Sequence, residues 1–147
     1  MERARPARPD DKPACRELLA RALGAARSAR GGEALAGTAN VDELLDRWMA
    51  AGPALTVYVG EFHDVVVGLA VATASGTSGR IECCYVEEGA RGVGVGTALM
   101  ESMVAWCTAQ GCRDIDALAL PGDRLTKQRL EAAGFSARLL VLNRPLS

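Results

Sequence analysis

The stretch Ala90–Met100, ARGVGVGTALM, is the part of the sequence that decides how the rest is interpreted. Its three glycines, Gly92, Gly94 and Gly96, stand where a β-rich run gives way to good helix formers. Glycine is the least favourable ordinary residue inside a helix and is weak inside a strand, at a cost of about 0.5–1 kcal/mol each. Their clustering at this junction therefore needs a physical reason.

A helix that begins near Val95 supplies such a reason. The N–H groups of a helix's first turn have no partner within the helix, and the helix dipole adds about half a positive charge there. A loop without side chains lets an anion reach these N–H groups, and Arg91 can add a charge at its edge. Charge-assisted hydrogen bonds contribute about 1.5–3 kcal/mol each, so several outweigh the cost of the glycines. The stretch therefore indicates a phosphate-binding turn.

Two alternatives compete with this interpretation. The glycines could serve only a tight turn between a strand and a helix, although one glycine would suffice for that. A dinucleotide-binding fold would need the pattern GxGxxG, but Thr97 stands where its third glycine belongs. Its ribose-binding acid should also lie at the far end of the next strand, whereas Asp114 and Asp116 open theirs.

The composition favours one globular domain over residues 1–147. Apolar residues make up 49% and charged residues 24%, and the net charge is −1. No one-signed patch for nucleic acid, no membrane span and no secretory leader is visible. The five cysteines include no CxxC pair and His63 is the only histidine, so we expect no metal site and no disulfide framework. We expect a cytoplasmic protein with reduced thiols.

The hydrophobic periodicity predicts a mixed α/β fold. Strands joined by short turns at 63–64 and 76–79 give an antiparallel meander, and helices flank it. The predicted strands cover residues 3–8, 54–62, 65–74, 80–86, 114–120 and 135–142. The predicted helices run from Asp10 to Gly24, from Asn40 to the stop at 52–53, from Val95 to Gly111 and from Asp123 to Gly134. Residues 24–40 are predicted to be a loop or a weak helix.

The glycine stretch in this setting resembles the GNAT N-acetyltransferase superfamily, whose pattern (Q/R)-x-x-G-x-(G/A) is met by Arg91, Gly94 and Gly96. The resemblance covers nearly the whole chain and implies a GNAT acyltransferase fold with a splayed central strand pair. It implies acetyl-CoA as co-substrate, with pantetheine bonded to the main chain around Cys84 and Val86. It also implies that the backbone N–H groups of the turn hold the diphosphate, namely those of Arg91, Gly92, Val93, Gly94, Val95, Gly96 and Thr97.

Acetyl transfer to an amine needs a base for the amine proton and an N–H donor for the developing oxyanion. Glu82 is the candidate base, because strand alternation places it on the face of Cys84 and Val86. The alternative is that Glu82 only pairs with an arginine. Tyr85 is a weaker candidate acid, because alternation points it away from Glu82 unless a bulge turns it.

This sequence departs from the family's pattern at the usual acid, because Leu130 stands where a tyrosine is common. Asp123 likewise stands where the family often has asparagine. The CoA thiolate could leave unassisted, because a thiol's pKa is only about 8.5. A covalent intermediate on Cys83 or Cys84 lacks support, since no histidine is expected nearby.

The sequence thus predicts an N-acetyltransferase that works by direct attack in a ternary complex. The acceptor would be a small-molecule or peptide amine, and a homodimer is left open. The alternative is a sensor module that binds acyl-CoA without turnover.

Overall fold

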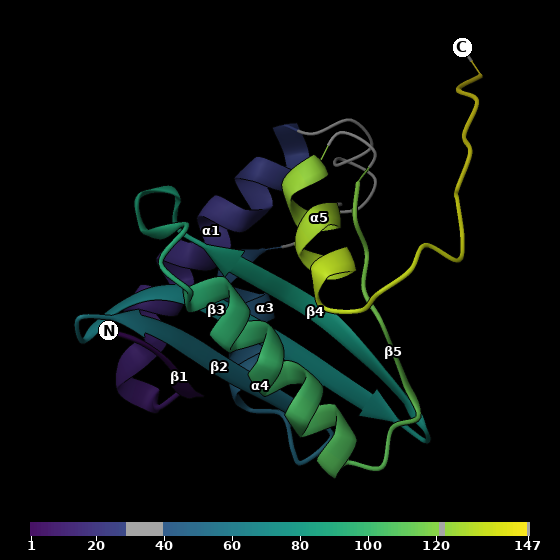
Figure 1. The fold of residues 1–147 in the computed structure, drawn as a ribbon. Helices are drawn as coiled ribbons and strands as arrows, with labels where there is room; N and C mark the ends of the chain where they lie inside the picture. The colour runs from purple at the N-terminus through teal and green to yellow at the C-terminus, as the bar shows by residue number, and fades with distance from the viewer. Residues whose placement is uncertain (29–39, 121–122, 147) are drawn as a thin grey trace.

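The computed structural model describes residues 1–28, 40–120 and 123–146. Five strands form one sheet in the order β1-β2-β3-β4-β5, antiparallel except for the parallel pair β4 and β5. This confirms the mixed sheet and the antiparallel meander (Figure 1). The elements are β1 (Glu2–Pro6), η1 (Pro9–Asp11), α1 (Lys12–Ser28), α3 (Val41–Met49), β2 (Leu55–Phe62), β3 (Val65–Ser75), β4 (Ser78–Val86), η2 (Glu88–Ala90), α4 (Val95–Ala109), β5 (Asp114–Asp116) and α5 (Arg124–Ala132).

Helix α4 covers one face of the sheet, and α1 and α3 cover the other (Figure 1). The α4 face buries Leu99, Met103 and Cys107 against small residues of β3. On the other face, a second cluster holds Leu19 and Leu45 against the opposite side of the same strands. The sheet is therefore buried on both faces, which is why β3 is an almost unbroken apolar run. Among the described helices, none is both long and apolar enough to cross a membrane.

Local signals fixed most of the helix ends. The Asn40 side chain caps α3 by accepting a hydrogen bond from the N–H of Glu43 at 3.0 Å. Gly111 and Gly134 follow α4 and α5 with φ of 86° and 93°, as left-handed helix ends require. Gly24 does not end α1, which continues to Ser28, because the alanines after it are strong helix formers.

Two strand predictions were wrong. The strand expected over 114–120 is only Asp114–Asp116, and residues 135–142 form no strand. Leu139–Leu142 have side chains that are at least 80% exposed. A strand needs a neighbouring edge for its backbone groups, and three residues of β5 offer too little of one. The predicted loop residues 29–39 and 121–122 lie outside the described residues.

Two glycines missed by the sequence analysis set the height of α4 above the sheet. Gly60 of β2 pairs with Gly68 of β3, which leaves a part of the sheet surface without side chains. The buried side chains of Val95 and Leu99 pack on this part of the surface. A Cβ on Gly68 would lie 2.8 Å from Leu99 Cδ1, and one on Gly60 would overlap Val95 Cγ1. The glycine pair thus allows the start of α4 to pack directly on the sheet.

We expect Gly60→Ala to lower the free energy of unfolding by about 1–3 kcal/mol, because the added methyl overpacks a closed core. The matched control is Gly24→Ala in α1, where an added Cβ meets no atom within 4 Å. That change should instead raise stability by about 0.5–1 kcal/mol. Urea denaturation measures both, and a neutral Gly60→Ala would contradict the packing described here.

Candidate functional site

The turn before α4 presents backbone N–H groups without partners. Gly94 is the N-cap residue of α4 and has φ of 92°, while Gly92 has φ of 86°. No side chain caps this helix, and within the described residues no loop or capping hydrogen bond uses the N–H groups of residues 92–97. Unpaired N–H groups at the positive end of a helix dipole attract an anion. The turn therefore has free N–H groups from which an anion could accept hydrogen bonds, and phosphate binding here stays a prediction.

The turn follows a strand whose outer edge is open. Strand β4 pairs with β5 only through Ser78–Arg80, and it then runs on to Val86 without a strand on that side among the described residues. All of β5 is paired, and the chain that follows it over residues 117–120 runs away from β4 without forming a strand (Figure 1). The expected splay between β4 and the 114–120 segment is thus present, although only 114–116 is strand. Cys84 and Val86 lie on the open part of β4, with their side chains in the α4 cluster. An open strand edge can bond the amide groups of an extended ligand.

Arg91 links the turn to the end of β4. Its Nε donates to the carbonyl oxygen of Val86 at 3.1 Å, and its Cζ lies 5.6 Å from the centre of the Tyr85 ring. The side chain is therefore held in place by a hydrogen bond and a cation–π contact. The Val86 carbonyl already has one donor, so a ligand at this edge would share it with Arg91.

Glu82 does not share the face of Cys84 and Val86, so this expectation was wrong. In the register, Val71 lies opposite Cys83 and Ala72 lies opposite Ile81, so Glu82 is an extra residue in a β-bulge. A bulge resets the alternation of side chains along its strand. The Thr73 hydroxyl donates to Glu82 Oε1 at 3.0 Å, and this places the carboxylate on the α1 and α3 side.

The bulge brings the two candidate catalytic residues to one face. Tyr85 is half-buried in the cluster on the α1 and α3 side, which is also the side of Glu82. Glu82 also lies 3.6 Å from Arg80 Nε, in an ion pair with both side chains partly exposed. The open alternative, in which Glu82 pairs with an arginine, is therefore present in the structure. An acid–base role for Glu82 stays a prediction.

The thiols of β4 are poor nucleophiles. Burial raises the pKa of Cys84 to about 11 and that of Cys83 to about 12. His63 lies in the β2–β3 turn, where its Nδ1 is 3.2 Å from the terminal amine of Met1. A covalent intermediate on cysteine thus lacks both a thiolate and a nearby histidine base. In the described part of the chain, no group of three or more His, Cys, Asp or Glu side chains could hold a metal ion.

Helix α5 contributes a residue that the sequence analysis missed. A Cβ built on Gly96 would lie 3.5 Å from Cζ and Nη1 of Arg129, so this guanidinium lies against the first turn of α4. Leu130, at the family's tyrosine position, is buried and has no proton to donate. Asp123 caps α5, where it accepts from the N–H of Thr126 at 3.1 Å. Nothing in the sequence indicated a role for Arg129, because its neighbours on α4 become known only when α5 is packed beside α4.

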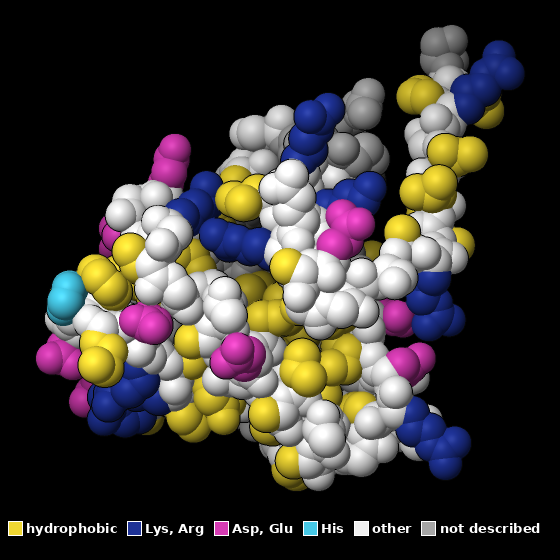
Figure 2. All heavy atoms as spheres, in the orientation of Figure 1, with side chains coloured by type: hydrophobic (Ala, Val, Ile, Leu, Met, Phe, Trp, Pro, Cys, Tyr) yellow, Lys and Arg dark blue, Asp and Glu magenta, His cyan; other side chains and the backbone are white. Residues whose placement is uncertain are grey.

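The surface around the open edge combines charge with an apolar floor. In Figure 2, Lys and Arg side chains lie over the upper part of the hollow between α4 and α5, and hydrophobic side chains line its floor. One carboxylate also lies near the turn, since Glu2 Oε1 would be 3.4 Å from a Cβ on Gly94. The hollow thus suits a ligand with both an anionic and an extended apolar part.

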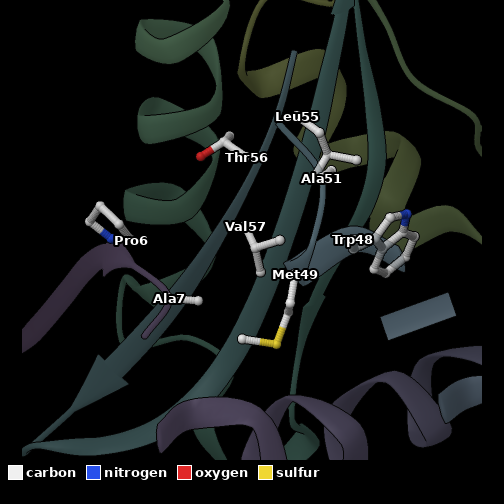
Figure 3. A pocket seen from close by; sticks show the side chains of 8 residues that line it. All are labelled: Pro6, Ala7, Trp48, Met49, Ala51, Leu55, Thr56 and Val57. Atoms are coloured by element: carbon white, nitrogen blue, oxygen red, sulfur yellow. The ribbon is translucent and has the colours of Figure 1, made fainter. Parts of the chain in front are cut away.

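A second hollow lies away from this edge (Figure 3). It has a volume of about 200 Å³ and lies where the ends of β1 and α3 meet the first residues of β2. Its lining residues are Pro6, Ala7, Trp48, Met49, Ala51, Leu55, Thr56 and Val57. They include no acid, base or thiol, and β3 separates them from β4, so this hollow carries none of the chemistry described above.

Comparison with known proteins bears on these features. The sequence model of the acetyltransferase (GNAT) family matches residues 27–135. A search of curated protein sequences finds no match. The similar solved structures include the aminoglycoside N-acetyltransferase AAC(6')-Iy in complex with a bisubstrate analogue, CoA-S-monomethyl-acetylneamine. Its TM-score is 0.78 at 17% identity, covering 100% of this chain and 99% of that one.

Two further structures show the same fold. One is glucosamine-6-phosphate N-acetyltransferase from Arabidopsis thaliana, with a TM-score of 0.71 at 17% identity, covering 100% of this chain and 99% of that one. The other is a protein from Clostridium acetobutylicum, described as a predicted acetyltransferase and solved with acetyl-CoA. It has a TM-score of 0.73 at 20% identity, covering 97% of this chain and 96% of that one. At these sequence identities, the similarity to the solved structures shows a shared fold alone.

Proposed function

Because the chain belongs to the acetyltransferase (GNAT) family, we propose that it transfers the acetyl group of acetyl-CoA to a primary amine. The observation that carries this proposal is the uncapped row of N–H groups at residues 92–97, beside the open edge of β4. The N–H row would hold the diphosphate, and the edge near Cys84 and Val86 would bond the pantetheine arm. The diphosphate and the pantetheine arm of CoA would thus bind to two adjacent parts of one site.

The proposed reaction is a direct attack in a ternary complex. The neutral amine nitrogen attacks the thioester carbonyl carbon, and the carbon–sulfur bond then breaks to release the CoA thiolate. A backbone N–H of β4 near Cys84 or Val86 would stabilise the oxyanion. The raised pKa values of Cys83 and Cys84 support an attack by the acceptor itself, because neither thiol ionises near neutral pH.

Glu82 is the proposed acceptor of the amine proton. The bulge turns its carboxylate toward the α1 and α3 side together with Tyr85, so an amine would have to approach from that side. Its hydrogen bond from Thr73 fixes the carboxylate. Tyr85 lies on the same face and is the proposed proton donor to the leaving thiolate.

The alternative function is a sensor that binds acyl-CoA without turnover. The observation that favours it is the buried Leu130, which cannot protonate the thiolate. A thiol's ordinary pKa of about 8.5 makes unassisted departure feasible, so Leu130 alone does not select the sensor.

We expect release of free CoA thiol from acetyl-CoA when the chain is offered a panel of amines. The panel should contain aminoglycosides and amino-sugar phosphates, which the names of the structural neighbours suggest, together with peptides carrying free amines. A thiol-reactive dye measures turnover, and reactions without amine are the control. Acetyl-CoA that binds but yields no thiol with any amine would favour the sensor.

Cellular location and assembly belong to the same proposal. We propose a cytoplasmic enzyme, a setting that suits five free cysteines. A homodimer remains an open prediction. The proposed acceptor is a small-molecule or peptide amine, and the proposal includes neither nucleic acid nor a membrane as a partner.

A further inference from the structure

The guanidinium of Arg129 lies at the meeting point of α4 and β4. A Cβ built on Gly96 would be 3.5 Å from its Cζ and Nη1, and 3.7 Å from Cγ2 of Val86. Burial raises the pKa of the Cys84 thiol, and the positive charge of the same guanidinium partly offsets this by lowering it. The charge therefore lies between the open edge of β4 and the first turn of α4.

Among the described residues, Arg129 has neither a hydrogen-bonding partner nor an ion-pair partner, and its side chain is half-buried. Arg5, which is also partly buried, is in contrast bound to two carboxylates. A cation at the N-terminus of a helix faces the positive end of the dipole, so it gains nothing from the helix itself. An anion bound between the guanidinium and the first-turn N–H groups would be attracted by both.

We propose that Arg129 binds the diphosphate of CoA together with the first-turn N–H groups of α4. This inference rests on the proposed function and adds a side-chain ligand to a site otherwise made of backbone. The planar guanidinium offers parallel N–H donors in the geometry that phosphate oxygens accept. One of those donors, Nη1, would lie 3.5 Å from a Cβ on Gly96, a residue of the first turn of α4.

The alternative roles of Arg129 make different predictions. If its stem only covers apolar surface, its charge is irrelevant to ligand binding. If it stabilises the leaving thiolate, its loss lowers kcat and leaves the affinity for CoA unchanged. A diphosphate ligand instead changes the affinity for CoA and not the rate at saturation.

The test compares Arg129→Ala and Arg129→Lys with Lys127→Ala, an exposed cation on the same helix. Calorimetry gives the Kd of CoA, and steady-state kinetics give kcat and KM for acetyl-CoA and for acetyl-pantetheine, which lacks the diphosphate. We expect Arg129→Ala to raise the Kd of CoA at least about tenfold, which corresponds to about 1.4 kcal/mol. The kcat at saturating acetyl-CoA and the KM for acetyl-pantetheine should stay within about twofold. Arg129→Lys should recover part of the affinity, and Lys127→Ala should match the wild type.

The outcomes separate this inference from the proposed function. If the wild type and Arg129→Ala bind CoA equally, Arg129 is no ligand, while the proposed function stands. A loss of kcat with an unchanged Kd overturns the inference in favour of a role at the thiolate. A wild-type chain that binds no CoA overturns the proposed function and this inference together. Thermal unfolding without ligand confirms that each variant is folded.

Discussion

We expect the Gly94→Glu variant to gain no thermal stability from CoA. In the wild type, CoA at about 100 times its Kd should stabilise the fold by about 2.7 kcal/mol. The variant places a carboxylate in the turn where the diphosphate is proposed to bind. Its Cβ would lie 3.2 Å from Cγ of Glu2, and the φ of 92° strains any side chain. Differential scanning fluorimetry with and without CoA measures the effect.

Gly111→Glu is the matched control for this experiment. Gly111 follows the opposite end of α4, has φ of 86°, and a Cβ there meets no atom within 4 Å. The control therefore carries the same strain and the same charge far from the proposed site. It should unfold at a lower temperature than the wild type and still gain the full stabilisation from CoA. A full gain in Gly94→Glu as well would place the CoA site elsewhere.

Of the substitutions described here, Arg5→Met should cause the largest loss in the free energy of unfolding. The Arg5 guanidinium donates to both oxygens of Asp11 at 2.8 and 2.9 Å and to Glu61 at 2.9 Å. Both carboxylates are buried, with 8% of each side chain exposed. Removing the cation leaves Asp11 without its ion-pair partner, while Glu61 keeps Arg3. The expected cost is therefore about 3 kcal/mol, at the low end for a broken buried pair. Arg16→Met is the control, because its ion pair with Asp42 is solvent-exposed and should contribute little to the free energy of unfolding.

The effect of Arg5 should depend on pH. Its hydrogen bond lowers the pKa of Asp11, and Arg3 together with Arg5 lowers that of Glu61. A carboxylate whose pKa is lower in the folded chain stabilises the fold above its unfolded value of about 4, and this contribution is lost as the pH falls through the folded value. The difference between the wild type and Arg5→Met should therefore shrink below about pH 4. Urea denaturation at pH 7 and pH 3 tests this, and a difference that grew with acid would contradict it.

Much of the fold followed from local patterns in the sequence. The meander was predictable because its strands are β-rich runs separated by turn residues, such as those at His63 and Asp64. The start of α4 was predictable because Gly94 and Gly96 break one pattern and Leu99 begins another. The Asn40 cap followed from its spacing to Glu43. These features depend on residues that are close together in the chain, which is why they could be predicted from this sequence alone.

The features that the sequence did not reveal depend on distant contacts. The face of Glu82 was wrong because the bulge is a property of the pairing with β3, and β4 alone contains no sign of it. Arg129 and the glycine pair Gly60 and Gly68 acquire meaning only when α4 and α5 are packed. The run Leu139–Leu142 has strand composition, yet strand formation also needs an edge that three-residue β5 does not offer.

The central claim is that the N–H groups between residues 92 and 97 bind the diphosphate of CoA. A crystal structure of the chain with acetyl-CoA tests it most directly. Our account predicts phosphate oxygens within hydrogen-bond distance of several of these N–H groups, with the pantetheine arm along the open edge of β4. A bound acetyl-CoA whose diphosphate lies elsewhere, with this turn empty, would contradict the account.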